Sequence, residues 1–139
     1  MSQAVAHTPA DIDVERGVEH LMALYPPMVK DRKSVRIQVQ DGVVTLSGHV
    51  LTPNTRDFML SRIPNVPGVT AINTDALYDD VSVRLNVAHL LPDGVRLARV
   101  QYGVLVLTGT LPAGMTTEQL AARIGAVPGV EHIIMQFED

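Results

Sequence analysis

The sequence predicts an α+β protein built from two copies of one unit, each with the order helix, strand, strand, helix, strand. Two internal repeats support this prediction, because residues 42–48 reappear as 103–109 and residues 62–69 reappear as 123–130 at the same offset. Hydrophobic periodicity supports it too, since some segments place apolar residues every three or four positions and others alternate apolar with polar side chains. The 139 residues are therefore expected to form two small units.

The first copy is expected to open with a helix. Thr8 offers a capping oxygen, and Pro9 suits the first helical position, where no amide hydrogen is needed. Because proline cannot continue the hydrogen-bond ladder, Pro26 and Pro27 end this helix. Its apolar face comprises Val14, Val18, Leu21 and Tyr25.

Two strands joined by a tight turn follow the helix. In residues 35–39, apolar side chains alternate with polar ones, as in a strand with one buried face. Asp41 and Gly42 tolerate the positive φ angles of a type I′ turn, so they predict a hairpin. Its second strand is expected at residues 43–50.

The second helix of this copy is expected to be capped by Thr52 or by Asn54. Pro64 disfavours a helical conformation in the residue before it, so the helix should end or kink near Ile63. A Pro-Gly-Val turn then leads into the closing strand, over residues 69–77.

The second copy repeats these elements. Thr116 and Gln119 predict a capping box at the start of its second helix, and the closing strand is expected at residues 130–137. This copy has one additional residue upstream of the repeated segment, which predicts a β-bulge near Gln101 and Tyr102.

Glycines recur at three matched pairs of positions. The first pair suits the hairpin turn, the second close packing within a strand, and the third a positive-φ exit from a helix. In that order, the pairs are Gly42 and Gly103, Gly48 and Gly109, and Gly68 and Gly129.

Two motifs point to a known family. The pattern Asp-Gly, a β run and Leu-Ser-Gly occupies residues 41–48, and Pro-Gly-Val followed by an apolar-Asn pair occupies residues 67–73. On these motifs the sequence resembles the BON domain of bacterial envelope and stress proteins, from about residue 12 to the end. The second copy keeps Gly103, Gly109 and Pro-Gly-Val, whereas Tyr102 stands where the family has Asp.

The resemblance implies a three-stranded sheet with two helices on one face in each unit. With the repeat boundaries, the first BON-like domain is expected at residues 1–80 and the second, shorter one at residues 81–139. For activity, the resemblance implies a non-enzymatic module that binds phospholipid surfaces, other hydrophobic or small ligands, or protein partners. Most members of the family are periplasmic.

Composition and motifs exclude several functions. The absence of cysteine excludes a disulfide scaffold, a thiolate zinc site and a cysteine nucleophile. A net charge of −4 and few aromatic residues argue against nucleic-acid binding. Because the sequence has no metal-ligand motif, phosphate loop or serine elbow, we expect no metal, no cofactor and no enzymatic activity.

The histidines offer a weaker hypothesis. His20 and His89 hold equivalent positions in the repeated first helix and could act as paired ligands or a pH switch. A surface position inherited by duplication is the favoured interpretation. Strand alternation turns His49 away from the face that carries Leu46, so a ligand role for His49 is also disfavoured.

A basic segment provides the candidate membrane-binding or anion-binding residues, which are Lys30, Arg32, Lys33 and Arg36. Each basic residue can contribute up to about 1 kcal/mol at an anionic surface, so with Asp31 subtracted the segment would supply on the order of 3 kcal/mol. Such binding would be weak and reversible. The alternative is a solvated loop between a helix and a strand.

An acidic cluster lies at the junction of the copies and at the chain end, comprising Asp75, Asp79, Asp80, Glu138 and Asp139. Carboxylates of this kind can coordinate a hard cation. A solubilising linker and tail are favoured instead, because no EF-hand spacing is present.

We therefore predict a non-enzymatic binding or adaptor module that engages an anionic phospholipid surface or a protein partner. A soluble small-ligand or cation sensor is the alternative. A homodimer could bury remaining apolar surface, with residues 83–91 as the best contact. The sequence shows no signal peptide, which favours a cytoplasmic location, including one at a membrane; a longer true N-terminus would make the protein periplasmic.

Overall fold

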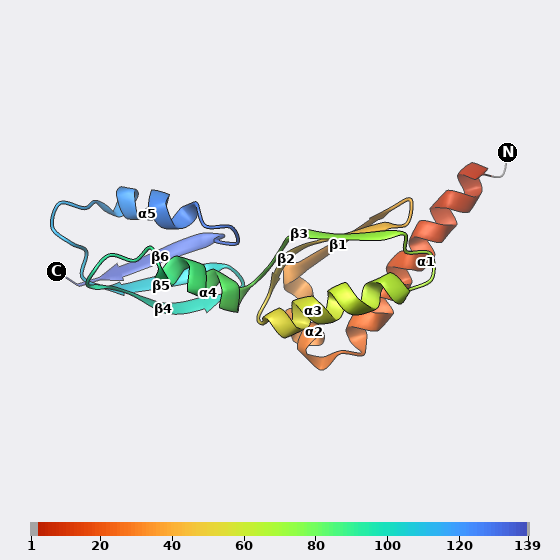
Figure 1. Ribbon diagram of the computed structural model, residues 1–139, viewed down its shortest axis with the longest axis horizontal. Coiled ribbons are helices and arrows are strands. Elements are labelled where there is room, and N and C mark those ends of the chain that lie inside the picture. The colour runs from red at the N-terminus through yellow and green to blue at the C-terminus, as the bar shows by residue number, and fades with distance from the viewer. Residues whose placement is uncertain (1–2, 139) are drawn as a thin grey trace.

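The computed structural model describes residues 3–138, with side chains from residue 10 onward. This part of the chain has two three-stranded sheets and five α-helices (Figure 1), which confirms that the protein is α+β. The helices are α1 (Gln3–Ala23), α2 (Pro26–Asp31), α3 (Pro53–Arg62), α4 (Asp80–Ala88) and α5 (Thr117–Gly125), with 3-10 turns η1 (Arg32–Ser34) and η2 (Ile63–Asn65). The strands are β1 (Val35–Gln40), β2 (Val43–Val50), β3 (Ala71–Asp79), β4 (Val95–Gln101), β5 (Val104–Gly109) and β6 (His132–Phe137).

In the N-terminal half, β1 and β2 form the predicted hairpin and β3 pairs with β2 in parallel. Asp41 and Gly42 have φ angles of 51° and 81°, the two positive values that a type I′ turn needs. Helices α1 and α3 cover one face of this sheet and share one core with it. The buried core residues include Val14, Val18, Met22, Met28, Leu46, Met59 and Ile63.

Helix α1 departs from the prediction at its start. It begins at Gln3, so Thr8 lies inside the helix and does not cap it. The expectation was wrong because proline has a helical φ, so Pro9 can remove one ladder hydrogen bond without ending the helix. The proline pair does stop α1, at Ala23, but it then starts the short helix α2, which the sequence periodicity did not indicate.

The capping predictions for the later helices are confirmed. The Thr52 side chain accepts a hydrogen bond from the amide of Thr55 at the start of α3, and α3 ends before Pro64. Thr116 and Gln119 make both hydrogen bonds of a capping box at α5. These local signals set the helix boundaries because each satisfies backbone groups that the helix cannot pair itself.

The C-terminal half repeats the same sheet, with β4 antiparallel to β5 and β6 parallel to β5. An extra residue is present in β4, but it lies between Leu97 and Arg99 and not near Gln101. The predicted position was wrong because Tyr102 and Gly103 take the two positive φ angles of a regular turn, 50° and 78°. The extra residue is therefore absorbed inside the strand.

The two halves are directly connected, since β3 ends at Asp79 and α4 begins at Asp80 (Figure 1). Within α4, Val83 and Val87 are buried in the core of their own half, whereas Val81 and Leu85 are exposed. The expected dimer helix therefore uses much of its apolar surface internally. Over residues 3–138, no helix is both long enough and apolar enough to span a bilayer.

Candidate functional site

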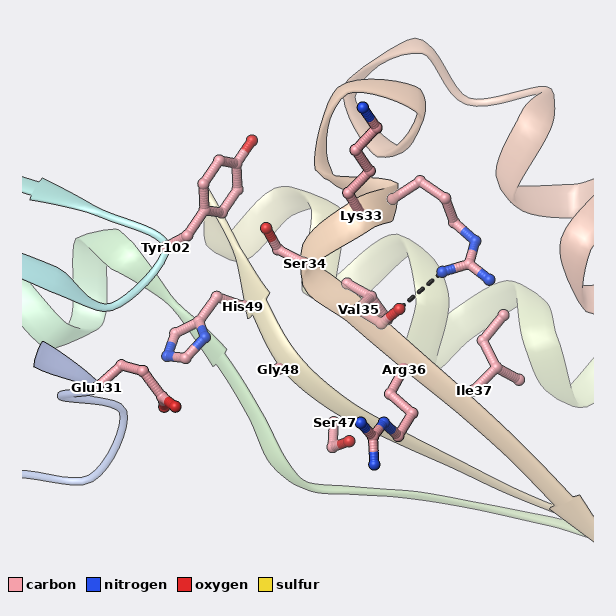
Figure 2. Close-up of a pocket in the computed structure, with 11 residues that line it drawn as sticks. Lys33, Ser34, Val35, Arg36, Ile37, Ser47, Gly48, His49, Tyr102 and Glu131 are labelled. Carbon is pink, nitrogen blue, oxygen red and sulfur yellow. Dashed lines mark hydrogen bonds between the residues drawn. The ribbon is translucent and has the colours of Figure 1, made fainter.

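A groove of 720 Å³ lies where the two halves meet, and we call it the junction groove. It contains three of the four predicted basic residues, Arg32, Lys33 and Arg36, whereas Lys30 is not part of its lining. The C-terminal half contributes Tyr102 and Glu131 to its wall (Figure 2). The remaining lining residues are Ser34, Val35, Ile37, Ser47, Gly48 and His49.

Arg32 is held by internal partners. Its guanidinium donates two hydrogen bonds to the Glu19 carboxylate, at 2.8 and 2.7 Å, and a third to the carbonyl oxygen of Val35 at 2.7 Å. The hydrogen bonds from Arg32 lower the pKa of the Glu19 carboxyl below its usual value, and Glu19 in turn raises the pKa of Arg32. Arg32 therefore acts first as a structural residue that ties η1 to α1.

The other two cations of the groove point in different directions. Figure 2 shows the Lys33 amino group on the α2 side and the Arg36 guanidinium beside the Ser47 side chain, at the opposite end of the groove. Arg36 and Ser47 are cross-strand partners on the outer face of the sheet. Because the charges do not converge, the groove is poorly arranged to surround one small anion.

Lys30 belongs to a second surface, which we call the α2 corner and define as Leu24, Val29, Lys30 and Lys33. Met28 and Asp31 form the buried side of α2, so Val29 and Lys30 face outward. Leu24 is 67% exposed and Val29 is 58% exposed. Exposed apolar and basic side chains therefore occur together within the ten residues from 24 to 33.

Tyr102 connects the two halves. Its hydroxyl donates a hydrogen bond of 2.7 Å to the Asp31 carboxylate, which also accepts one of 3.1 Å from the amide of Leu51. Asp31 is 1% exposed, so these two donors take the place of water around its carboxylate oxygens. Burial, followed by the contact with Asp31, raises the pKa of the Tyr102 hydroxyl well above its usual value.

Asp80, the first residue of α4, binds the turn between β4 and β5 that contains Tyr102. Its carboxylate accepts hydrogen bonds from the amides of Tyr102, at 2.5 Å, and Gly103, at 3.1 Å. Asp11 makes the equivalent pair of bonds to the first hairpin, to the amides of Asp41 and Gly42. Burial raises the pKa of the Asp80 carboxyl above its usual value, although the two amides act in the opposite direction.

His49 is a further connection that the sequence analysis did not identify. Its side chain is buried, and Nε2 donates a hydrogen bond of 2.8 Å to the carbonyl oxygen of Gly129. A Cβ on Gly103 would overlap the imidazole, so glycine is required there both for its φ of 78° and for space. The expectation that His49 lies away from Leu46 was sound, but the C-terminal half covers that face at the junction.

The predicted acidic cluster has mainly structural roles. Asp79 caps α4 by accepting a 2.8 Å hydrogen bond from the amide of Ser82, and Asp80 holds the hairpin turn. Both are buried, so the expectation of a solubilising linker was wrong for these two residues. Asp75 and Glu138 are exposed, and Asp139 lies outside the described residues. No group of side chains suited to a metal ion occurs within residues 3–138.

The strand glycines have a clear geometric role. Gly48 and Gly109 have φ angles of 112° and 98°. A Cβ on Gly48 would overlap the carbonyl oxygen of Ser34, and a Cβ on Gly109 would overlap that of Gly94. These positions admit close approach of neighbouring backbone, which no other residue allows.

Comparison with known proteins gives one family and one structure. The BON domain family matches residues 13–84. The fold is similar to the C-terminal domain of CdsD, described as the structural protein of the type III secretion system of Chlamydia trachomatis, with a TM-score of 0.59 and 21% sequence identity. The alignment covers 91% of this chain and 64% of that one, so the chain spans less than two thirds of that structure. No curated protein matches the chain.

Proposed function

The chain belongs to the BON domain family, and we propose that it is a non-catalytic binding module that attaches reversibly to an anionic phospholipid surface through the α2 corner. BON domains are generally associated with binding, which supports the class of function. The observation that carries the proposal is that Leu24, Val29, Lys30 and Lys33 are all exposed within one stretch of ten residues.

The proposal includes a second BON-like unit, so that the domains are residues 1–80 and 81–139. The same strand order and pairing in both sheets supports this division. The same contact between a helix carboxylate and a hairpin turn, made by Asp11 and by Asp80, supports it further. Such agreement in detail is expected of a duplication, because one local device is retained in both copies.

The charges of the basic segment have separate roles. Glu19 neutralises Arg32, whereas Lys30, Lys33 and Arg36 form no ion pair among the side chains described. Unpaired lysines near an anionic leaflet contribute about 1 kcal/mol each, so Lys30 and Lys33 together give about 2 kcal/mol. This charge alone would bind a membrane only weakly.

Leu24 and Val29 add an apolar contribution. Their exposed side chains could enter the boundary between headgroups and acyl chains, which stabilises binding by roughly 3 kcal/mol for the pair. With the lysines the sum is about 5 kcal/mol, which corresponds to a dissociation constant on the order of 100 µM. The expected attachment is reversible and depends on salt.

Co-sedimentation with vesicles tests this function. The full chain is mixed with phosphatidylcholine vesicles that contain about 30% phosphatidylserine and, separately, with pure phosphatidylcholine vesicles. Binding to the anionic vesicles should weaken by at least about thirtyfold for the double variant Lys30→Glu/Lys33→Glu, since about 2 kcal/mol of attraction is lost and the two carboxylates are repelled by the anionic surface. The double variant Leu24→Ser/Val29→Ser should also bind more weakly, but its remaining binding should still decrease with salt.

A control variant separates local charge from net charge. Arg16→Glu/Arg123→Glu reverses two exposed arginines that are not part of the α2 corner and changes the net charge by the same amount. It should bind anionic vesicles within about twofold of the unmodified chain. Equal weakening by both charge variants, or no pelleting with anionic vesicles, would refute the membrane proposal.

Failure of vesicle binding would leave a protein partner for the same surface. The structural neighbour is described as a structural protein of a secretion system, which is consistent with contacts between proteins. A small-ligand or cation sensor has less support, because the groove cations diverge and no metal-binding cluster occurs among the described side chains. A thermal-shift screen with metal ions and small anions would reveal such a sensor as a rise in Tm.

A further inference from the structure

The two sheets present four edge strands, and three of them carry features that hinder pairing with another chain. On β3, one extra residue lies between Asn73 and Ala76, which disturbs the register with β2. Arg56 donates a 3.0 Å hydrogen bond to the carbonyl oxygen of Leu77, and Asn73 accepts one of 2.9 Å from the amide of Asp75. Bulges and side chains on the backbone are known ways to block an edge.

Strands β1 and β4 are also hindered. The first carbonyl of β1, on Val35, is bonded to Arg32, and the strand carries the exposed cation Arg36. Strand β4 contains the irregularity before Arg99 and has two exposed arginines, Arg96 and Arg99. Charge on an edge strand disfavours addition of another strand.

Strand β6 has none of these features within the described residues. It pairs with β5 in unbroken register, and no side chain bonds to its backbone. Its sequence from His132 to Phe137 contains no lysine, arginine, aspartate, glutamate or proline. On the more exposed face of the sheet, Ile134 is 38% exposed and is the pairing partner of Val106 on β5.

The backbone groups that β6 leaves open can be assigned. Glu138 donates its amide to the carbonyl oxygen of Gly109, so by alternation the even-numbered residues point their backbone groups towards β5. The amides and carbonyls of Ile133, Met135 and Phe137 therefore face away from the sheet. This is a regular row of unpaired donors and acceptors.

We infer that β6 is a pairing surface for a second copy of this chain, in which the two β6 strands run antiparallel and are centred on Met135. This register places Ile133 opposite Phe137 of the second copy, so every outward amide and carbonyl of β6 gains a partner. It also places His132 opposite Glu138 of the second copy, a complementary pair when the histidine is protonated. Two three-stranded sheets would become one six-stranded sheet with two-fold symmetry.

Sedimentation velocity over a range of concentrations tests the pairing. One strand pair buries less than the roughly 1,600 Å² of a standard interface, so dimers should appear at concentrations on the order of 100 µM. Ile134→Lys places a charge beside the pairing surface and should weaken dimerisation about tenfold. Ala76→Lys, on the hindered edge β3, is the matched control and should leave dimerisation unchanged.

Cross-linking tests the register. The chain has no cysteine, so single cysteines can be placed freely. An oxidised mixture of Ile134→Cys and Gln136→Cys should form a 134–136 cross-link, because these residues face each other at about 4.5 Å between Cα atoms in the expected pairing. Ala76→Cys mixed with either should not cross-link.

The following results would overturn the inference. A chain that stays monomeric up to ~1 mM has no such interface, because even weak pairing would be populated there. Growth beyond dimers would indicate a head-to-tail contact. If Leu85→Asp abolishes the dimer and Ile134→Lys leaves it intact, the contact lies on the exposed side of α4 and not on β6. None of these results bears on vesicle binding through the α2 corner.

Discussion

Replacing Tyr102 with phenylalanine tests how the two halves are held together. The change removes one hydroxyl, which donates a 2.7 Å hydrogen bond to a carboxylate that is 1% exposed. A hydrogen bond to a charged group contributes about 1.5–3 kcal/mol, and among the described residues Asp31 would retain only the 3.1 Å bond from the amide of Leu51. We expect Tyr102→Phe to lower the free energy of unfolding by about 2 kcal/mol.

Urea denaturation followed by circular dichroism measures this loss, and Tyr78→Phe is the matched control. The Tyr78 hydroxyl makes no hydrogen bond to the described residues, so its loss should cost well under 1 kcal/mol. A double-mutant cycle with Asp31→Asn should give a coupling energy of about 1.5 kcal/mol. If the cycle shows no coupling, or if both tyrosine variants lose the same stability, the junction does not depend on this bond.

Three further predictions concern charge and backbone. Glu19→Gln should lower the free energy of unfolding by less than about 1 kcal/mol at pH 7, because both partners of the ion pair are more than a third exposed. This difference between the variant and the unmodified chain should vanish as pH falls through the lowered pKa of Glu19, which unfolding measured at several pH values would show. The pKa of Asp80 is raised in the folded state, so the free energy of unfolding should decrease as pH rises from below the pKa of the unfolded state to above that of the folded state. Asp80→Asn should remove this decrease from the dependence of stability on pH. Gly48→Ala should lower the free energy of unfolding by about 3 kcal/mol or more through its clash with backbone, whereas Gly114→Ala, with open space around it, should cost about 1 kcal/mol in the same denaturation assay.

Local signals in the sequence predicted most of the elements. The Asp41–Gly42 turn, the Thr52 cap and the Thr116 capping box act over a few residues, so they could be identified without knowledge of the tertiary structure. Helix α2 was missed because six residues after two prolines show too little periodicity to distinguish a helix from a loop.

The junction could not be predicted from periodicity, because its contacts join residues far apart in the chain. Asp31 meets Tyr102, and His49 meets Gly129. One signal was available: Tyr102 replaces the family's Asp at the hairpin, which indicates that this position does something else in the second half. The four basic residues look alike in the sequence, and only the fold reveals that Glu19 neutralises Arg32, while their role in binding stays a prediction.

The two proposed surfaces lie on different halves of the molecule, since α2 belongs to the N-terminal half and β6 to the C-terminal half (Figure 1). A dimer paired through β6 would therefore carry two α2 corners. If both reach one bilayer, the second attachment is intramolecular, and apparent affinity can rise by about a hundredfold or more without any new contact.

Comparing Ile134→Lys with the unmodified chain on anionic vesicles tests this coupling between the two proposals. At protein concentrations well below the dimerisation constant both should bind equally, whereas above it the variant should bind more weakly while keeping the same dependence on salt. Equal binding at all concentrations, for a chain that does dimerise, would mean that the two corners of a dimer cannot face one membrane together, because linked sites raise affinity only where geometry lets both engage.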